Sequence, residues 1–209
     1  MVNDMTRGKP AKILMVFMLP MLLGNIFQQL YNIVDTVIVG NYVGADALAA
    51  VGSTAAMVFL LVAVAMGLSM GCSVLISQYF GAGDKKNMRR AVFTSMVFIL
   101  AVGALVCVLG LAISDWLLHL IQTPANIFEG ASTYINIYYM GCIFLFTYNG
   151  LAAICRAVGD SKTPLYFLIV AALLNIVLDL VFVIYFNMGV AGVAWATLIA
   201  QGGSAGTCP

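Results

Sequence analysis

The chain has 209 residues, of which 63% are hydrophobic and 8% are charged, with a net charge of +1 at pH 7. Its mean hydropathy is +1.07. Soluble domains carry about 25% charged residues, so this composition excludes an ordinary soluble domain. We therefore expect an all-helical integral membrane protein that lies in a lipid bilayer and has no nucleic-acid partner.

Six apolar runs in the sequence are long enough to cross a membrane as helices. About 20 residues suffice at a rise of 1.5 Å per residue. We predict transmembrane helices at residues 13–42, 48–80, 91–114, 131–154, 165–186 and from 190 onward. Glycine and charged residues gather in two of the predicted connections, and the longest predicted connection covers residues 115–130.

This segmentation divides the chain into three parts. Residues 1–12 form a short N-terminal segment, and residues 13–201 form one bundle of six transmembrane helices. The last part, residues 202–209, reads GGSAGTCP and no longer has the composition of a membrane helix. We expect a truncated end there, which would make the sequence a fragment.

The positive residues support six crossings. All nine Lys and Arg residues lie before the first predicted helix, between the second and third, or between the fourth and fifth. In a six-helix protein these three segments share one side of the membrane. Positive residues favour the cytoplasmic side, so we predict a multi-pass protein with a cytoplasmic N-terminus.

Two aspartates interrupt the predicted helices. Asp35 lies nine residues before Gly44, and Asp179 lies eight residues before Asn187. At 1.5 Å per residue, both carboxyl groups lie roughly 12–14 Å below the outer ends of their helices. A charge at the centre of a membrane costs roughly 2.5–3.5 kcal/mol, and no Lys or Arg falls within a predicted span to neutralise these two. We infer that they are protonated, hydrated or paired with a cation.

Other polar side chains accompany these aspartates. Gln28 and Asn32 share a helical face with Asp35, and Asn175 precedes Asp179 by one turn. The pattern predicts a shared polar chamber, although amides and hydroxyls in membranes also serve only to bond neighbouring helices. The remaining polar residues within the predicted helices that we consider are Tyr134, Tyr138, Asn149 and Thr197.

Gly67 and Gly71 form a GxxxG spacing in the second predicted helix. Small residues at this spacing allow two helices to approach closely. We expect them to serve packing within the chain. The five cysteines show no short paired spacing, so they predict neither a zinc site nor a disulfide framework.

Four blocks of sequence follow one another in a distinctive order. They are LPMLLGNIFQQLYNIVDTVIVGNYVGADALAAVG (19–52), SQYFGAGDKKNMRRA (77–91), AICRAVGDSKTP (153–164) and LLNIVLDLVFVIYFNMGVAGVAWATLIAQ (173–201). Their order and spacing resemble the multidrug and toxic compound extrusion (MATE) transporters. The similarity covers nearly the whole chain and is strongest to the prokaryotic branch named for a DNA-damage-inducible protein.

The resemblance implies a fold and an activity. Members of this family have twelve helices in two six-helix bundles, and this chain resembles the N-terminal bundle. They export organic cations or toxic compounds from the cell in exchange for H⁺ or Na⁺. The resemblance thus implies a plasma-membrane antiporter of a prokaryote that is not an enzyme, needs no cofactor besides its coupling ion, and lacks its C-terminal half unless two copies pair.

The resemblance also implies roles for individual residues. Asp35 and Asp179 match the carboxylates of the first and fifth helices that form the cation-coupling chamber. Residues expected to complete this chamber are Asn175, Asn149, Thr197 and Tyr134. A Na⁺ ion would be held by Asp35, Asn149, Asn175 and Asp179. Gln28, Asn32 and Tyr138 are expected to line the substrate cavity.

Functions of other classes fit the sequence less well. An intramembrane aspartyl protease also uses two membrane aspartates, but its GxGD motif is missing at membrane depth, since Gly159-Asp160 is preceded by Ala157-Val158 and lies in a predicted loop. A retinal protein needs a membrane lysine, which the predicted spans lack. The main alternative is a lipid-linked oligosaccharide flippase of the same superfamily, which would be expected to have arginine within its spans. A non-transporting assembly subunit also stays open.

Overall fold

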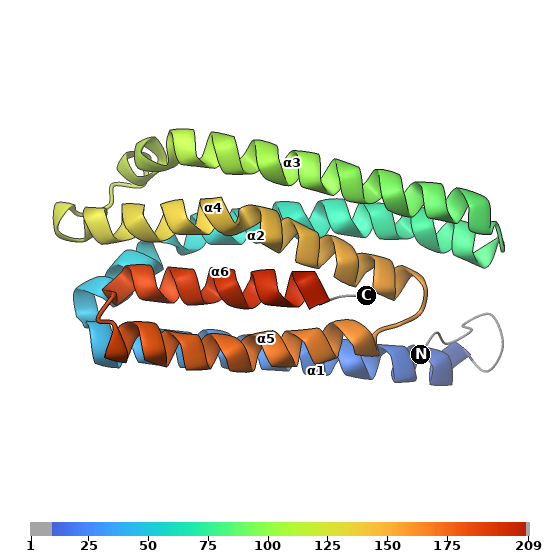
Figure 1. The fold of residues 1–209 in the computed structure, drawn as a ribbon, viewed down its shortest axis with the longest axis horizontal. Coiled ribbons are helices and arrows are strands. Elements are labelled where there is room, and N and C mark those ends of the chain that lie inside the picture. The colour runs from blue at the N-terminus through green and yellow to red at the C-terminus, as the bar shows by residue number, and fades with distance from the viewer. Residues whose placement is uncertain (1–9, 208–209) are drawn as a thin grey trace.

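The computed structural model describes the backbone of residues 10–207 and the side chains of residues 15–203, and it confirms an all-helical fold. Long helices run back and forth along one axis (Figure 1). The α-helices are α1 (Pro10–Ile38), α2 (Ala45–Gly81), α3 (Lys85–Leu120), α4 (Ala125–Ala157), α5 (Lys162–Leu180) and α6 (Gly189–Thr207). Two π-helical turns, η1 (Val39–Val43) and η2 (Val181–Tyr185), extend α1 and α5.

Four of these helices are long and apolar enough to cross a membrane, judged over the described residues. They are α2, α3, α4, and α5 together with η2. Every predicted span therefore corresponds to a helix, and four of the six meet the criterion for a crossing.

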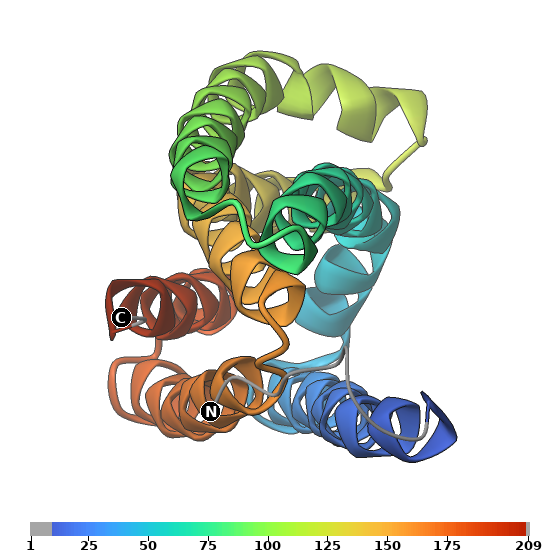
Figure 2. The ribbon, with the colours of Figure 1, turned by 90° about the vertical axis from the view of Figure 1, so that its right-hand side faces the viewer.

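The helices form two layers, seen most clearly along the bundle (Figure 2). One layer contains α2, α3 and α4, and the other contains α1, α5 and α6. Helix α4 connects the layers, because it packs on α2 and α3 and also on α6. The main apolar core lies within the first layer and includes Met57, Ile99, Ile135 and Phe146.

Glycines bring α4 close to its neighbours. A Cβ atom at Gly110 of α3 would collide with the ring of Tyr139, and one at Gly141 would lie 2.8 Å from Leu198 of α6. The expectation that Gly67 and Gly71 pack within the chain is wrong, because a Cβ at either would meet nothing within 4 Å. The close helix contacts thus use glycines outside the GxxxG spacing.

The connection predicted over residues 115–130 is much shorter in the structure. Helix α3 continues to Leu120 and α4 begins at Ala125. Side-chain hydrogen bonds join the two helices across this region, since Ser132 donates to Asp115 (2.6 Å) and Ser114 donates to Asn136 (2.7 Å). The bond from Ser132 gives Asp115, which was predicted to lie in the connection, a partner on the neighbouring helix.

Two other helix ends also differ from the predicted boundaries. Helix α4 extends to Ala157, so Arg156 belongs to the helix and not to the following connection. Helix α6 continues to Thr207, six residues past Gln201, where a membrane helix was expected to stop. Of the predicted end segments, residues 1–9 and 208–209 lie outside the described residues.

The positive side chains gather at one end of the bundle. The α2–α3 and α4–α5 connections lie at the right-hand end of Figure 1, together with the N-terminal end of α1. The described Lys and Arg residues all lie at the helix ends that border these connections: Lys85, Lys86, Arg89, Arg90, Arg156 and Lys162. An aspartate lies just before each of the two helices that start there. Asp84 caps α3, and Asp160 accepts hydrogen bonds from the first turn of α5.

Candidate functional site

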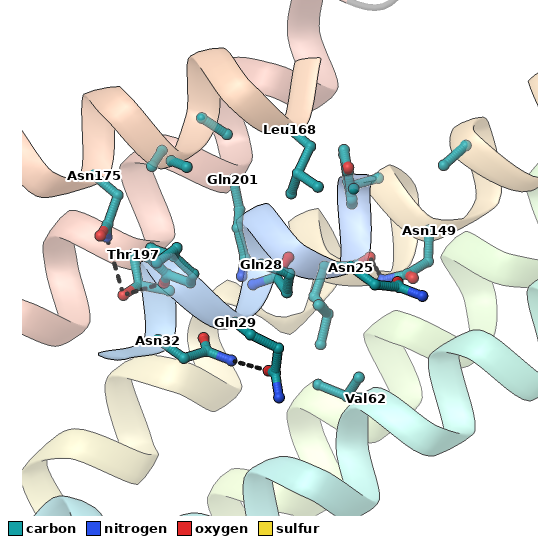
Figure 3. Close-up of a pocket in the computed structure, with 18 of the residues that line it drawn as sticks. Asn25, Gln28, Gln29, Asn32, Val62, Asn149, Leu168, Asn175, Thr197 and Gln201 are labelled. Carbon is teal, nitrogen blue, oxygen red and sulfur yellow. Dashed lines mark hydrogen bonds between the residues drawn. The ribbon is translucent and has the colours of Figure 1, made fainter. Parts of the chain in front are cut away.

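A cavity of about 620 Å³ opens between the layers. Residues of α1, α2, α4, α5 and α6 line this cavity. The residues of α1 include a polar stripe that consists of Asn25, Gln28, Asn32 and Asp35. Figure 3 shows this stripe between Asn175 and Thr197 on one side and Asn149 on the other. Of the predicted site residues, the cavity wall contains Gln28, Asn32, Asp35, Tyr134, Tyr138, Asn149, Asn175 and Thr197.

Asp35 and Asp179 lie within hydrogen-bonding reach of each other. Asp179 is completely buried behind the cavity wall, whereas Asp35 is partly exposed in the cavity. One oxygen of each carboxyl group is buried without a hydrogen-bond donor among the described residues. Two adjacent carboxylates repel each other, so the pair is suited to holding a proton or a metal cation between them.

Asn175 and Thr197 support this pair from α5 and α6. In the amide orientation that satisfies both its ends, Asn175 donates to Asp179 Oδ2 at 2.8 Å. Its carbonyl oxygen then accepts from the Thr197 hydroxyl at 3.3 Å and from the Thr197 backbone N–H at 3.1 Å. Both side chains are buried, so this chain of bonds holds the Asp179 carboxyl group in place.

The tyrosines complete the surroundings of Asp35. Tyr134 and Tyr138 of α4 both lie close enough to Asp35 to interact with its charge. Tyr134 is buried, and Tyr138 forms a hydrogen bond with Gln201 of α6. The structure thus brings Tyr134 next to the carboxyl pair, where the resemblance put it.

Two further residues were missed in the sequence. The Tyr31 hydroxyl lies 3.4 Å from the Thr197 hydroxyl, and Tyr31 also interacts with the charge of Asp35. Gln201 lines the cavity beside Tyr138. The available signal was spacing, because Tyr31 lies one helical turn before Asp35 and Gln201 one turn after Thr197.

The structure does not bring Asn149 to the carboxyl pair. Asn149 follows Tyr134 by fifteen residues, which corresponds to about 22 Å along α4. Its amide donates to the Leu145 carbonyl at 2.8 Å, and Figure 3 places it at the far side of the α1 stripe from Thr197. Of the four Na⁺ ligands expected from the resemblance, the structure brings Asp35, Asn175 and Asp179 together and leaves Asn149 apart.

Arg156 also lines the cavity. Arg156 lies in the last turn of α4, just beyond the predicted span 131–154. Arg156 follows Tyr138 by eighteen residues, or about 27 Å along the helix, so it lies far from the carboxyl pair.

Comparison with known proteins identifies the family. The family model described as MatE matches residues 20–181. The chain belongs to the MATE family. It is 36% identical over 199 residues to the "Probable multidrug resistance protein YpnP" of Bacillus subtilis, covering 95% of this chain. It is 31% identical over 189 residues to the DNA damage-inducible protein F of Escherichia coli, covering 88% of this chain.

Solved structures agree with this assignment. A MOP superfamily transporter from Pyrococcus furiosus superposes with a TM-score of 0.90 at 30% identity over 95% of this chain. A multidrug resistance MATE transporter in an outward-facing conformation gives the same TM-score at 29% identity. MATE proteins are membrane transporters and not enzymes, as the resemblance implied.

The chain spans less than half of these proteins. It covers 45% of the Bacillus subtilis relative, 40% of the Escherichia coli relative and 44% of the Pyrococcus furiosus structure. Within the MATE family, its six helices therefore correspond to about one half of a transporter.

Proposed function

We propose that this chain is the N-terminal half of a cation-coupled antiporter that exports organic cations or toxic compounds from a prokaryotic cell. The observation that carries the proposal is the contact between Asp35 and Asp179 beside the cavity, with one oxygen of each carboxyl group buried without a donor. Such a pair favours binding of H⁺ or Na⁺.

The proposed cycle uses the pair as a switch. A proton or Na⁺ enters from outside and neutralises the pair, with Asn175, Thr197 and Tyr134 around it. Loss of the repulsion between Asp35 and Asp179 changes which conformation of the bundle is favoured, because the ion binds one conformation more tightly than the other. Substrate released from the cavity then leaves outward. Gln28, Asn32 and Tyr138 would contact that substrate on the cavity wall.

The membrane arrangement belongs to the same proposal. All six helices would cross the plasma membrane, and the positive end of the bundle would face the cytoplasm together with the N-terminus. A second six-helix bundle would face this one, either a C-terminal half or a second copy, because MATE relatives are more than twice as long as this chain. No cofactor besides the coupling ion is involved.

Export fits better than the flippase alternative. Two of the proteins named above are described as a "Probable multidrug resistance protein" and a multidrug resistance MATE family transporter. The lack of arginine within the spans no longer argues against a flippase, since Arg156 lines the cavity. The choice of exporter therefore rests on the relatives and on the carboxyl pair.

The test is transport into everted membrane vesicles that contain the protein at its natural length. With ethidium as the organic cation, an imposed pH or Na⁺ gradient should drive uptake, and the effective gradient identifies the coupling ion. Asp179→Asn should reduce gradient-driven uptake at least about tenfold, because an amide neither binds a proton nor supplies a charge for Na⁺.

The matched control is Asp46→Asn, which changes an exposed carboxylate in the first turn of α2. It should leave uptake unchanged at equal protein levels. Unchanged gradient-driven uptake in Asp179→Asn would refute the proposed role of the pair.

A further inference from the structure

Arg156 occupies the end of the cavity farthest from the carboxyl pair. It lies in the last turn of α4, partly exposed, on the cavity wall. Asn149 and Ser161 line the same wall, from α4 and from the connection that precedes α5. This end of the cavity therefore combines a fixed positive charge with an amide and a hydroxyl.

No carboxylate among the described residues pairs with this arginine. The ionisable groups that act on its charge are the Tyr148 phenol and the Cys155 thiol. Asp160 follows it by one turn, but its carboxylate accepts from the backbone N–H of Lys162 and Thr163 at 3.1 Å each. It also accepts from the Thr163 hydroxyl at 2.8 Å. Asp160 is thus committed to the start of α5.

Asp35 is too distant to compensate the charge. The separation of about 27 Å along α4 between Tyr138, beside Asp35, and Arg156 is about three Debye lengths at physiological ionic strength. The cavity wall thus contains a carboxyl group at Asp35 and, far from it, a guanidinium at Arg156. A guanidinium presents planar donors that match the oxygens of carboxylate, phosphate or sulfonate groups.

We propose that Arg156 forms an anion subsite at this end of the cavity, which binds the acidic group of an amphipathic molecule. The inference rests on the proposed use of the cavity for binding, but it does not depend on the coupling ion. It widens the substrate class from organic cations to amphipathic compounds that carry a carboxylate, phosphate or sulfonate. The same chemistry would also accept the phosphate of an anionic lipid headgroup.

The experiment measures equilibrium binding without any gradient. The protein at its natural length is placed in phosphatidylcholine nanodiscs, and binding of 1-naphthyl phosphate and of 1-naphthol is measured by dialysis against empty nanodiscs. The two probes differ only in the phosphate group. Arg156→Gln should weaken binding of 1-naphthyl phosphate roughly tenfold or more and leave 1-naphthol unchanged, whereas Arg156→Lys should restore part of the loss.

Arg90→Gln is the matched control, because it removes an exposed arginine at the same end of the bundle. Unchanged 1-naphthyl phosphate binding in Arg156→Gln, or an equal loss in Arg90→Gln, would overturn the proposal. Intact 1-naphthol binding shows that the variant is folded. Because Asp179→Asn tests ion-coupled uptake, a failure there leaves this binding result unaffected.

A second set of nanodiscs distinguishes the two sources of the anion. If a lipid headgroup fills the subsite, adding phosphatidylglycerol should weaken 1-naphthyl phosphate binding in the wild type. Less phosphatidylglycerol should then remain bound to Arg156→Gln in native mass spectrometry. If a soluble compound is the natural ligand, phosphatidylglycerol should have the same small effect on the wild type and on Arg90→Gln. Both results support the subsite, and they differ only in its occupant.

Discussion

The two layers of the bundle bury polar groups in different ways. In the layer of α2, α3 and α4, the main core is apolar, and the buried Thr54 hydroxyl donates to a carbonyl of its own helix. In the layer of α1, α5 and α6, buried Asn175 and Asp179 bond or contact groups on other helices. The first layer is therefore closely packed and apolar, whereas the second forms a polar network beside the cavity.

This difference has a functional consequence. Close packing through glycine gives α3 and α4 little freedom to move, because a dense interface does not deform continuously. The polar layer instead depends on charge, since its Asp35–Asp179 contact changes in energy when an ion binds. We expect the first layer to act as a scaffold and the second to respond to the coupling ion. Substitutions in each layer test this contrast.

The largest effect on stability should come from the packed layer. Gly110→Ala would place a methyl group in the ring of Tyr139, and overpacking of this kind destabilises by about 1–3 kcal/mol. Thermal unfolding in detergent should show a clear decrease. Gly67→Ala is the control, because nothing lies within 4 Å of the added atom, and an equal decrease there would contradict the contrast.

Asn175→Ala should have a smaller effect on stability but a specific effect on ion dependence. It leaves Asp179 Oδ2 and the Thr197 hydroxyl without their amide partner, and a lost buried hydrogen bond costs about 1–2 kcal/mol. The ion concentration for half-maximal uptake should shift, which a purely structural role would not cause. Asn41→Ala, at an exposed position in η1, serves as the control. An unshifted ion dependence would remove Asn175 from the proposed site.

The smallest effects should come from the aspartates that begin α3 and α5. Hydrogen bonds from the Asn87 backbone and side chain hold the pKa of Asp84 below its usual range. Partial burial raises the pKa of Asp160, but the bonds from Thr163 and Lys162 outweigh this and lower it. A lowered pKa in the folded state stabilises fully above the usual value of about 3.9, and the contribution disappears as the pH falls through the folded value.

Hydrogen exchange at the first turns of α3 and α5 checks this prediction. Amide protection there should decrease when the pH is lowered through the folded-state pKa values of Asp84 and Asp160. Asp84→Asn should remove the pH dependence at α3 only, because Asn still caps a helix without titrating. Equal pH dependence in Asp84→Asn would contradict the assignment. Exchange in the middle of α4 should stay unchanged in both proteins.

Much of the fold followed from the sequence. Each of the six apolar runs corresponds to a helix, and the described positive residues lie at one end of the bundle. The errors came from polar residues near helix ends. Asp115 was assigned to a loop, but the hydrogen bonds from Ser132 to Asp115 and from Ser114 to Asn136 join α3 and α4 as both helices continue. Such bonds depend on which helices are neighbours, and periodicity in one helix does not contain that information.

The candidate site was also predicted only in part from the sequence. Local spacing placed Gln28, Asn32 and Asp35 on one face of α1, and the cavity wall contains all three. Only the packing of α1 and α6 against α5 brought Tyr31 to Thr197 and Thr197 to Asn175. The rise along α4 separates Asn149 from Tyr134 and the carboxyl pair, although the resemblance grouped them.

The sequence by itself determined the membrane class and the helices, because hydropathy and helical rise are local properties, and it predicted the depth of Asp35 and Asp179. The tertiary structure decided that the two carboxyl groups touch and that Arg156 faces the cavity. It also decided that Gly110, and not Gly67, supports a close helix contact. These outcomes depend on how helices distant in sequence pack together, which sets every contact between them.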